Sequence, residues 1–266
     1  MSGMEQILNE LAAYAAERTE RAKSRRPLFS VRAEAEYMPK GMFAFEHALQ
    51  RNDDIAFICE CKKASPSKGL IAPEFPYLQI AKEYEAAGAD CISVLTEPSR
   101  FLGSNRYLQE IAEAVALPCL RKDFTVDPYM IYEAKLLGAS AVLLICSILD
   151  AGQLREYLEI ADSVGLSALT EAHTVQEIET AVRAGARIIG VNNRNLGDFT
   201  VDPQNAVRLR GYVPEGILFV AESGIRTPAD VQAARDAGAD AVLIGETLMR
   251  AADKTKALHE LRGDRT

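Results

Sequence analysis

The sequence predicts an α/β fold, a (β/α)8 TIM barrel with an N-terminal helical extension. The first supporting observation is a repeat: an Ala-Gly-Ala or Leu-Gly-Ala step precedes an apolar run four times, with its glycine at Gly88, Gly138, Gly185 and Gly238. The second is that four more apolar runs fall before or between these steps, which makes eight short candidate strands. Strands that alternate with helices in this number favour a closed parallel barrel.

Residues 1–45 precede the first expected strand. Residues 4–23 have an amphipathic helical pattern, and Arg25-Arg26-Pro27 is expected to end that helix because proline cannot continue it. The segment is too short to form a core of its own. We therefore expect a single domain over residues 1–266, in which residues 1–45 form a helical extension packed on a barrel of residues 46–266.

The expected strands are apolar on both faces, as a parallel sheet covered by helices requires. Each repeated glycine follows a helical pattern and opens an apolar run, so it is expected to end the helix in the left-handed conformation that alanine adopts only at a cost. The strands are expected at Ala56–Cys61, Cys91–Leu95, Pro118–Lys122, Ala141–Ile145, Leu166–Glu171, Ile188–Val191, Ile217–Glu222 and Ala241–Ile244.

Helical patterns follow each of these strands. Three of them begin with Asp127, Asp202 or Thr227 followed by proline, which is typical of a capping residue and a proline at the first helical position. The expected helices are Tyr77–Ala87, Asn105–Ala116, Pro128–Leu137, Ala151–Val164, Val175–Ala184, Pro203–Leu209, Pro228–Ala237 and Thr247–Leu261.

An open, doubly wound sheet is the alternative arrangement of the same elements. Such sheets usually carry a Gly-rich phosphate-binding turn after the first strand, and no G-x-G-x-x-G motif occurs in this sequence. The recurrent spacing of the strand–helix units favours the closed barrel.

The charge of the chain limits its partners. Thirty basic and 38 acidic residues give a net charge of −8, and proteins that bind nucleic acid usually present a basic field, so we expect no nucleic-acid partner. No apolar run approaches the roughly 18 residues that span a bilayer, and residues 1–22 have no apolar signal core. We expect a cytoplasmic protein with no membrane partner, and a monomer or at most a weak homodimer.

The cysteines and histidines do not suggest a metal site. Five cysteines, an odd number, lie in apolar runs without a C-x-x-C pair, so we expect them to be reduced and buried. The three histidines have no metal-ligand spacing, and each is expected to be a surface or capping residue. The cysteines are Cys59, Cys61, Cys91, Cys119 and Cys146, and the histidines are His47, His173 and His259.

The first expected strand ends in charged residues. Side chains alternate along a strand, so Glu60 and Lys62 share one face while Cys59 and Cys61 point to the other. Burying a carboxylate and an ammonium costs several kcal/mol unless they are paired or functional. This strand tip, followed by serines and a glycine, is therefore a candidate site for a small anionic substrate.

Polar residues also end the other strands, and in a barrel these ends meet at one rim, where catalytic residues lie. Any one of them is most often a solvated loop residue. We expect two lysines and three acids to crowd together there, and like charges to lower lysine pKa values and raise acid pKa values, which suits proton transfer. The expected rim residues are Glu60, Lys62, Thr96, Glu97, Lys122, Glu171, Asn192, Arg194 and Glu222.

A phosphate site is expected after the last two strands. Ser223, Gly224 and Gly245 occur at these strand ends, where glycine lets backbone N–H groups approach an anion and the next helix adds its dipole. Glu246 lies beside Gly245, so its side chain is expected to point away from the phosphate. The alternative is that these glycines only form tight turns.

At these residues the chain resembles the indole-3-glycerol phosphate synthase family, over nearly its whole length and including the N-terminal extension. The K-x-S-P-S-x-G turn together with K-D-F is the most specific part of this resemblance. It rests on Glu60-Cys61-Lys62-Lys63-Ala64-Ser65-Pro66-Ser67-Lys68-Gly69, Ser93-Val94-Leu95-Thr96-Glu97, Phe101-Leu102-Gly103-Ser104, Arg121-Lys122-Asp123-Phe124, Thr170-Glu171, Gly190-Val191-Asn192-Asn193-Arg194, Ala221-Glu222-Ser223-Gly224-Ile225 and Gly245-Glu246.

The resemblance implies a phosphorylated small-molecule substrate, 1-(2-carboxyphenylamino)-1-deoxyribulose 5-phosphate. It implies an indole ring closure onto a ketone, followed by loss of carbon dioxide and water, with no cofactor and no metal. By the same resemblance, Lys122 is the general acid at the ketone oxygen. Lys62 holds the carboxylate and is a candidate acid for the dehydration, and Glu171 is the base for the later proton removal.

The remaining implied roles are positioning and binding. The resemblance implies that Glu60, Asn192 and Glu222 orient the lysines and the sugar hydroxyls, and that Arg194 supports Glu60 or Asn192. It implies phosphate contacts from Ser65, Gly224 and Gly245 at the ends of the first and last strands, with Ser223 and Glu246 as further substrate-binding residues, and a wall of Phe124, Leu143 and Ile145 around the anthranilate ring.

Two other functions remain open at this point. A Schiff-base aldolase also uses a barrel lysine beside an acid, and borohydride would trap its substrate adduct. A non-catalytic phosphosugar-binding barrel would show affinity without turnover. The number of polar strand ends exceeds what phosphate binding alone requires.

Overall fold

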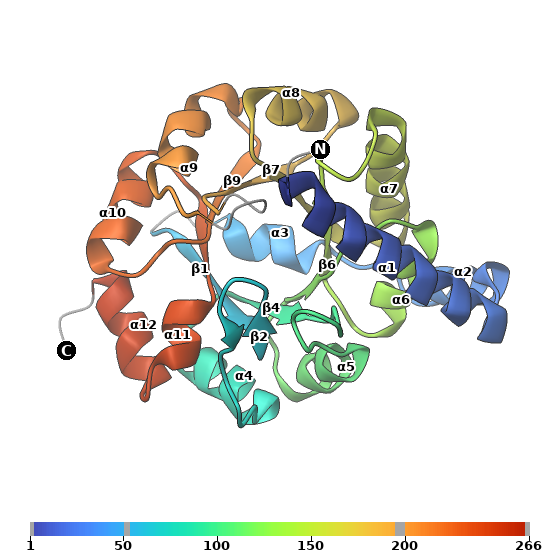
Figure 1. Cartoon of the computed structure of the whole chain (residues 1–266), viewed down its shortest axis with the longest axis horizontal. Helices are drawn as coiled ribbons and strands as arrows, with labels where there is room; N and C mark the ends of the chain where they lie inside the picture. Colours follow the sequence, from blue (N-terminus) through green and yellow to red (C-terminus); the bar gives the residue numbers. More distant parts are fainter. Residues whose placement is uncertain (1–2, 51–53, 195–199, 264–266) are drawn as a thin grey trace.

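The computed structural model describes residues 3–50, 54–194 and 200–263, and it confirms the barrel (Figure 1). The strands of the barrel are β1 (Ala56–Cys61), β4 (Cys91–Leu95), β5 (Cys119–Lys122), β6 (Ala141–Ile145), β7 (Ser167–Ala172), β8 (Ile188–Asn192), β9 (Leu218–Glu222) and β10 (Ala241–Ile244). All are parallel, and they close in the order β1-β10-β9-β8-β7-β6-β5-β4.

A short hairpin, which the sequence did not predict, lies in the loop after β1. Its strands β2 (Ala64–Ser65) and β3 (Gly69–Leu70) pair antiparallel. The Ala64 N–H also donates to the Phe101 carbonyl at 3.2 Å, which joins this loop to the loop after β4. The hairpin thus gives the Ser-Pro-Ser turn a defined backbone at the rim of the barrel.

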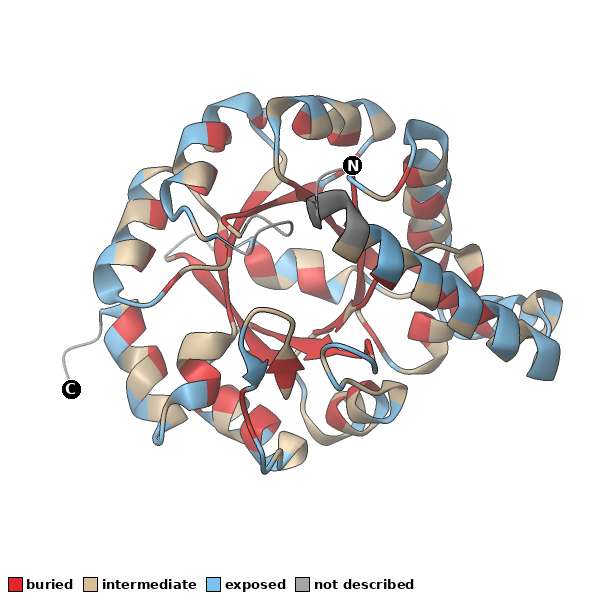
Figure 2. Ribbon diagram, in the orientation of Figure 1, coloured by how far each residue is buried: buried red, intermediate tan, exposed pale blue. Residues whose placement is uncertain are grey.

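The outer layer consists of helices whose buried faces point toward the strands (Figure 2). The four repeated glycines all have φ between 79° and 96°, as expected for glycines that end helices before a strand. The helices are α4 (Tyr77–Ala86), α5 (Asn105–Ala114), α6 (Pro128–Leu136), α7 (Ala151–Val164), α8 (Val175–Ala184), α9 (Gln204–Leu209), α10 (Pro228–Asp236), α11 (Glu246–Arg250) and α12 (Lys254–Arg262), with a 3-10 turn at Arg210–Tyr212.

Two helix predictions differ from the structure. The expected Thr247–Leu261 helix is two helices, because the chain is extended at Ala251 and Asp253 caps α12 by accepting from the Lys256 N–H. Asp202 does not occupy the expected capping position, which Pro203 takes, although Asp202 still accepts from the Gln204 N–H at 3.0 Å. The Asp127 and Thr227 caps are as predicted.

Strand alternation divides the core into two layers. Phe57, Cys59 and Cys61 pack between the strands and the helices, while Ile58 points into the barrel. All five cysteines are buried free thiols, as predicted. Because the cysteines of β1 point outward, Glu60 and Lys62 are left to face the mouth of the barrel.

The N-terminal extension is more elaborate than the single predicted helix. Pro27 ends α1 (Gly3–Arg25) but also begins α2 (Leu28–Tyr37), which packs on α6, and α3 (Ala44–Leu49) follows. Phe45 and Leu49 of α3 are buried against the amino ends of the strands, and the Glu46 N–H donates to Ser167 Oγ. In Figure 1, α1 lies at the end of the barrel nearer the viewer, and α3 lies at the far end, where it is visible through the ring of strands.

Candidate active site

A pocket of about 370 Å³ lies at the carboxyl ends of the barrel strands. Of the residues predicted to act in catalysis or substrate binding, only Glu222 lies outside its wall, and Glu222 contacts the Lys122 ammonium. The predicted residues in the wall are Glu60, Lys62, Ser65, Lys122, Phe124, Glu171, Asn192, Arg194, Ser223, Gly224, Gly245 and Glu246.

Lys122 is at the centre of the charged part of this pocket. Its Nζ lies 2.6 Å from Glu222 Oε2 and 3.4 Å from Glu171 Oε2. These contacts form because Lys122, Glu171 and Glu222 lie at or near the carboxyl ends of β5, β7 and β9 and point into the barrel mouth. Both carboxylates are buried, so the ion pairs form in a poorly screened environment.

The pKa of Lys122 is raised, not lowered as we expected from crowding of like charges. Burial opposes the ammonium form, but the charges of Glu222, Glu171 and Glu60 outweigh it. The expectation was wrong because it counted two lysines together, whereas Lys62 is ion-paired with Glu60 and Lys122 faces the acids. The structure therefore keeps Lys122 protonated and able to act as an acid.

The two carboxylates beside Lys122 have different pKa values. Burial and the neighbouring charges of Glu171 and Glu60 raise the pKa of Glu222 to about 7, against the opposing effect of Lys122. Burial also acts on Glu171, but Lys122, His173 and an Asn192 hydrogen bond outweigh it and lower its pKa. Glu171 is thus the ionised member of the pair and is available as a carboxylate at neutral pH, while Glu222 is readily neutralised.

Two glycines make room for these side chains. A Cβ atom on Gly190 would collide with Glu222 Oε1, and one on Gly245 would collide with Glu60 Oε2 and lie 2.6 Å from Lys62 Nζ. The Glu60 carboxylate is held by the Lys62 ammonium, so neither end can move freely. Gly245 therefore serves the Glu60–Lys62 ion pair, a role that its sequence position did not indicate.

We expect Gly245→Ala to lower kcat by up to about 10²-fold, because misplacing a catalytic group by about 1 Å can cost that much. Gly245 has φ −115°, so alanine can keep the backbone conformation and the fold. Steady-state kinetics and a thermal unfolding curve would measure both effects. The matched control is Gly211→Ala, where a Cβ atom meets nothing within 4 Å. Turnover of Gly245→Ala close to wild type would show that the ion pair does not need this space.

Asn192 is oriented by its neighbours in the loop after β8. Its Oδ1 accepts from the Arg194 N–H at 2.9 Å, so Arg194 supports Asn192 through its backbone. The Arg194 guanidinium instead donates to Ser67 Oγ at 3.2 Å, in the loop after β1. Burial lowers the pKa of Arg194, against the charges of Glu246 and Glu60. The hydrogen bond from Arg194 to Ser67 joins the loops after β1 and β8 across the pocket mouth.

The glycine-rich end of the pocket lies at β9 and β10. Ser223 and Gly224 both have positive φ, 64° and 79°, which turns the backbone sharply after β9. Arg226 and Arg250, which our sequence interpretation missed, line the same end of the pocket. Glu246 is at its edge and contacts Arg250 at 3.1 Å and Lys68 at 3.8 Å. The Glu246 carboxylate is thus paired with the side chains of Arg250 and Lys68.

The opposite end of the pocket is apolar. Phe124, Leu143 and Ile145 line it as expected, and Leu95 and Phe101 add to it. The Phe101 and Phe124 rings lie 6.3 Å apart between centroids. The pocket therefore has an apolar end, a charged centre and a glycine- and arginine-rich end.

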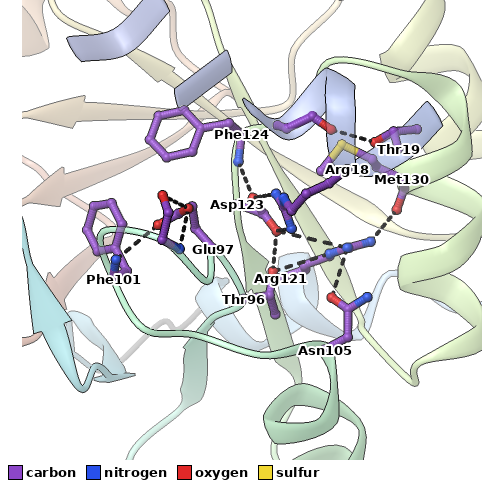
Figure 3. Close-up of polar contacts among 12 residues, drawn as sticks. Arg18, Thr19, Thr96, Glu97, Phe101, Asn105, Arg121, Asp123, Phe124 and Met130 are labelled. Carbon is purple, nitrogen blue, oxygen red and sulfur yellow. Dashed lines mark hydrogen bonds and ion pairs between the residues drawn. The ribbon is translucent and has the colours of Figure 1, made fainter. Parts of the chain in front are cut away.

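Asp123 connects the N-terminal helix to this site (Figure 3). Arg18 of α1 donates to Asp123 Oδ1 at 2.7 Å, and the Thr96 hydroxyl donates to Oδ2 at 2.6 Å. The Phe124 N–H donates to Asp123 Oδ1 at 2.8 Å. The buried carboxylate, which follows Lys122 directly, thereby ties α1 and the end of β4 to the strand that carries Lys122.

Glu97 organises the loop after β4 and does not join the charged centre, although its strand-end position led us to expect this. Its carboxylate accepts from the N–H groups of Ser99, Arg100 and Phe101 at 2.7 to 2.9 Å (Figure 3). Phe101 is thereby held in the apolar end of the pocket.

Among residues 3–50, 54–194 and 200–263, no group of three or more His, Cys, Asp or Glu side chains is arranged to hold a metal ion. None of the described helices has the length and apolar character that a bilayer crossing needs.

Comparison with known proteins is consistent with this geometry. A structure of 3-hexulose-6-phosphate synthase from Salmonella typhimurium has a TM-score of 0.65 at 13% identity and covers 79% of this chain and 97% of its own, which shows the fold alone. A protein named indole-3-glycerol phosphate synthase from Ruminiclostridium cellulolyticum is 56% identical over 258 residues, 97% of this chain and 99% of the relative. A protein of the same name from Leuconostoc mesenteroides is 50% identical over 262 residues, 97% and 100% of the two chains. The family model for indole-3-glycerol phosphate synthase matches residues 8–261. The chain therefore belongs to the indole-3-glycerol phosphate synthase family.

Proposed function

We propose that this protein converts 1-(2-carboxyphenylamino)-1-deoxyribulose 5-phosphate to indole-3-glycerol phosphate, with loss of carbon dioxide and water. The observation that carries the proposal is the Lys122 ammonium, held against two buried carboxylates beside the Glu60–Lys62 ion pair. This charged centre lies between an apolar end and an end rich in glycine and arginine. The substrate has an aromatic ring, a ketone and a phosphate in the same order.

In the first step, the ring carbon that carries the carboxylate forms a bond to the ketone carbon. Negative charge develops on the ketone oxygen, and Lys122 donates a proton to it. A lysine whose pKa is raised by neighbouring acids is protonated at neutral pH and therefore carries the proton that this step needs. Lys62 pairs with the substrate carboxylate until it leaves as carbon dioxide, and the electron pair then returns to the aromatic ring.

In the second stage, the new hydroxyl leaves as water with a proton from Lys62, and Glu171 removes a proton to complete the indole. Glu171 suits this role because its pKa is lowered and it remains a carboxylate. Its Oε2 lies 3.4 Å from Lys122 Nζ, so it can return the proton to the lysine that lost one. Over the whole reaction a carboxylate becomes carbon dioxide, so one proton is taken up from solvent.

The remaining site residues fit supporting roles. Glu222 neutralises part of the charge near Lys122, and a pKa near 7 lets it take up a proton when the anionic substrate arrives. Asn192 and Glu60 orient Glu171 and Lys62. We assign the phosphate to the end formed by Ser65, Ser223, Gly224 and Gly245, with Arg226, Arg250 and Glu246 around it, and the anthranilate ring to the end formed by Phe124, Leu143, Ile145 and Phe101.

The Schiff-base alternative is disfavoured by the charges around Lys122. An amine must be neutral to attack a carbonyl, and three carboxylates favour the ammonium form of this lysine. Borohydride treatment with substrate should accordingly leave the protein mass unchanged.

The proposal is tested by incubating the protein with the anilino-deoxyribulose phosphate and following indole fluorescence. We expect fluorescence to rise with each turnover and carbon dioxide to be released in equal amount. Folded protein that binds the substrate without forming indole would support the non-catalytic phosphosugar-binding barrel instead. Folded protein that neither binds nor converts it would remove both assignments.

We further propose that the protein acts as a single-domain monomer in the cytoplasm. One chain contributes all the site residues discussed above, so catalysis does not require a partner subunit. The five buried free thiols suit a reducing compartment. Sedimentation at enzyme concentrations used in the assay would distinguish the monomer from a weak homodimer.

A further inference from the structure

His173 is half-buried, whereas we expected each histidine to be a surface or capping residue. It directly follows β7, two residues after Glu171, and only 17% of its side chain is exposed. By contrast His47 is exposed on α3, at the other end of the barrel. Side-chain alternation brings His173 to the same face of the chain as Glu171. This placement next to the proposed base was not visible as a motif.

The His173 ring and the Glu171 carboxylate face each other. The distance from His173 Nε2 to Glu171 Oε1 is 3.5 Å, and within the described residues neither atom has a hydrogen-bond partner. The other oxygen, Glu171 Oε2, faces Lys122 Nζ. Two buried polar atoms that are turned toward each other are expected to pair, because a buried polar atom left without a hydrogen bond is destabilising.

Glu177 contacts the His173 ring on the side opposite Glu171. Its Oε2 accepts from the His173 backbone N–H at 2.5 Å and lies 3.5 Å from His173 Nδ1. Glu177 is itself fixed in the first turn of α8, where its N–H donates to the capping Thr174 hydroxyl. The imidazole therefore lies between two carboxylates, one from the proposed active site and one from the helix that follows.

We propose that His173 is a positioning residue that, held by Glu177, donates from Nε2 to Glu171 Oε1 and so turns Glu171 Oε2 toward Lys122 and the substrate. This inference rests on the proposed role of Glu171 as the base. An imidazole can donate to both carboxylates only as the imidazolium, because neutral histidine has one N–H. The arrangement thus couples the protonation of His173 to the orientation of Glu171.

The surrounding charges favour the imidazolium. Burial lowers the pKa of His173, but the Glu177 hydrogen bond and the charges of Glu171, Glu177 and Glu222 outweigh it and raise the pKa. On the β6 side, burial together with Glu177 and Glu171 raises the pKa of the Cys146 thiol to about 12, so that group stays neutral. Lys122 lies beyond Glu171 and is paired with the carboxylates. No cation in this set opposes the charge on the ring directly.

The kinetic test compares His173→Leu, which removes the donor and the charge, with His173→Gln, whose amide restores a neutral donor. We expect His173→Leu to lower kcat by about 10- to 100-fold, in the range that a displaced catalytic group costs, with little change in KM because His173 does not line the pocket. The acid limb of its kcat–pH profile should move to higher pH, because the pKa of Glu171 rises without the cation. His173→Gln should recover most of kcat but keep part of the pH shift, and His47→Leu should match wild type.

A second measurement does not depend on turnover. NMR titration of the His173 imidazole signals should give a midpoint above the ordinary value for histidine, and Glu171→Gln and Glu177→Gln should each lower it. An unchanged His173 midpoint in Glu171→Gln overturns the proposal even if the enzyme is active. Shifted midpoints in a protein that makes no indole would keep the pairing and reject the proposed function. In an active enzyme, equal kinetics for the Leu and Gln variants would reject the positioning role.

Discussion

Replacing Lys122 with alanine is expected to lower kcat by about 10²- to 10⁴-fold, the usual range for loss of a positioned general acid. The ketone oxygen would then gain negative charge without a nearby proton. The pKa of Glu222, now without its ion-pair partner, should rise above about 7, so the buried acids become neutral instead of carrying unpaired charge. Indole fluorescence under saturating substrate measures the loss.

Lys122→Arg separates charge from proton donation at the same position. Arginine keeps the ion pairs with Glu171 and Glu222 but does not release its proton near neutral pH. We expect both variants to lose turnover, while only Lys122→Ala changes the pH dependence of thermal unfolding. Lys82→Ala, at an exposed position on α4, serves as the control for lysine loss. Substantial turnover by Lys122→Arg would assign the acid role to another group.

The direction of side chains along a strand and the ends of the helices could be predicted, because each depends on residues close together in the sequence. Alternation along β1 is enough to send Glu60 and Lys62 inward and the two cysteines outward, and the four glycines mark helix ends by their own conformation. The parallel order of the strands then brings the charged ends to one rim. These inferences use the alternation of residues within a strand and the recurrence of the glycine step, both of which the sequence displays directly.

Pairing between strands was not predictable in the same way. Whether Lys122 lies nearer Lys62 or Glu222 depends on the stagger of the barrel, where Asn192 is level with Glu222 and Glu171 is level with Gly190. A neighbouring lysine would lower the pKa of Lys122, whereas the neighbouring acids raise it. The contact of Arg18 with Asp123 spans 105 residues and has no sequence signal beyond a charge on an amphipathic helix. Likewise α3 is only six residues long, too short for a period to be visible.

Replacing Glu171 with glutamine should separate the two halves of the reaction. The amide has nearly the shape of the carboxylate and can still contact Lys122, but it accepts no proton. We expect indole formation to fall by about 10²- to 10⁴-fold. Ring closure and decarboxylation use Lys122 and Lys62, so they should continue, at a rate changed only by the loss of one of the three acids that raise the pKa of Lys122.

A single-turnover experiment makes this distinction measurable. With enzyme in excess, Glu171→Gln should release carbon dioxide at a rate near wild type while indole fluorescence lags far behind, so a decarboxylated intermediate accumulates. Glu156→Gln, at an exposed position on α7, should show neither effect. If carbon dioxide and indole slow together in Glu171→Gln, then Glu171 acts at or before decarboxylation. Its lowered pKa and its contact with Lys122 would in that case serve the ring closure, with the proton of Lys122 held in place by the carboxylate beside it.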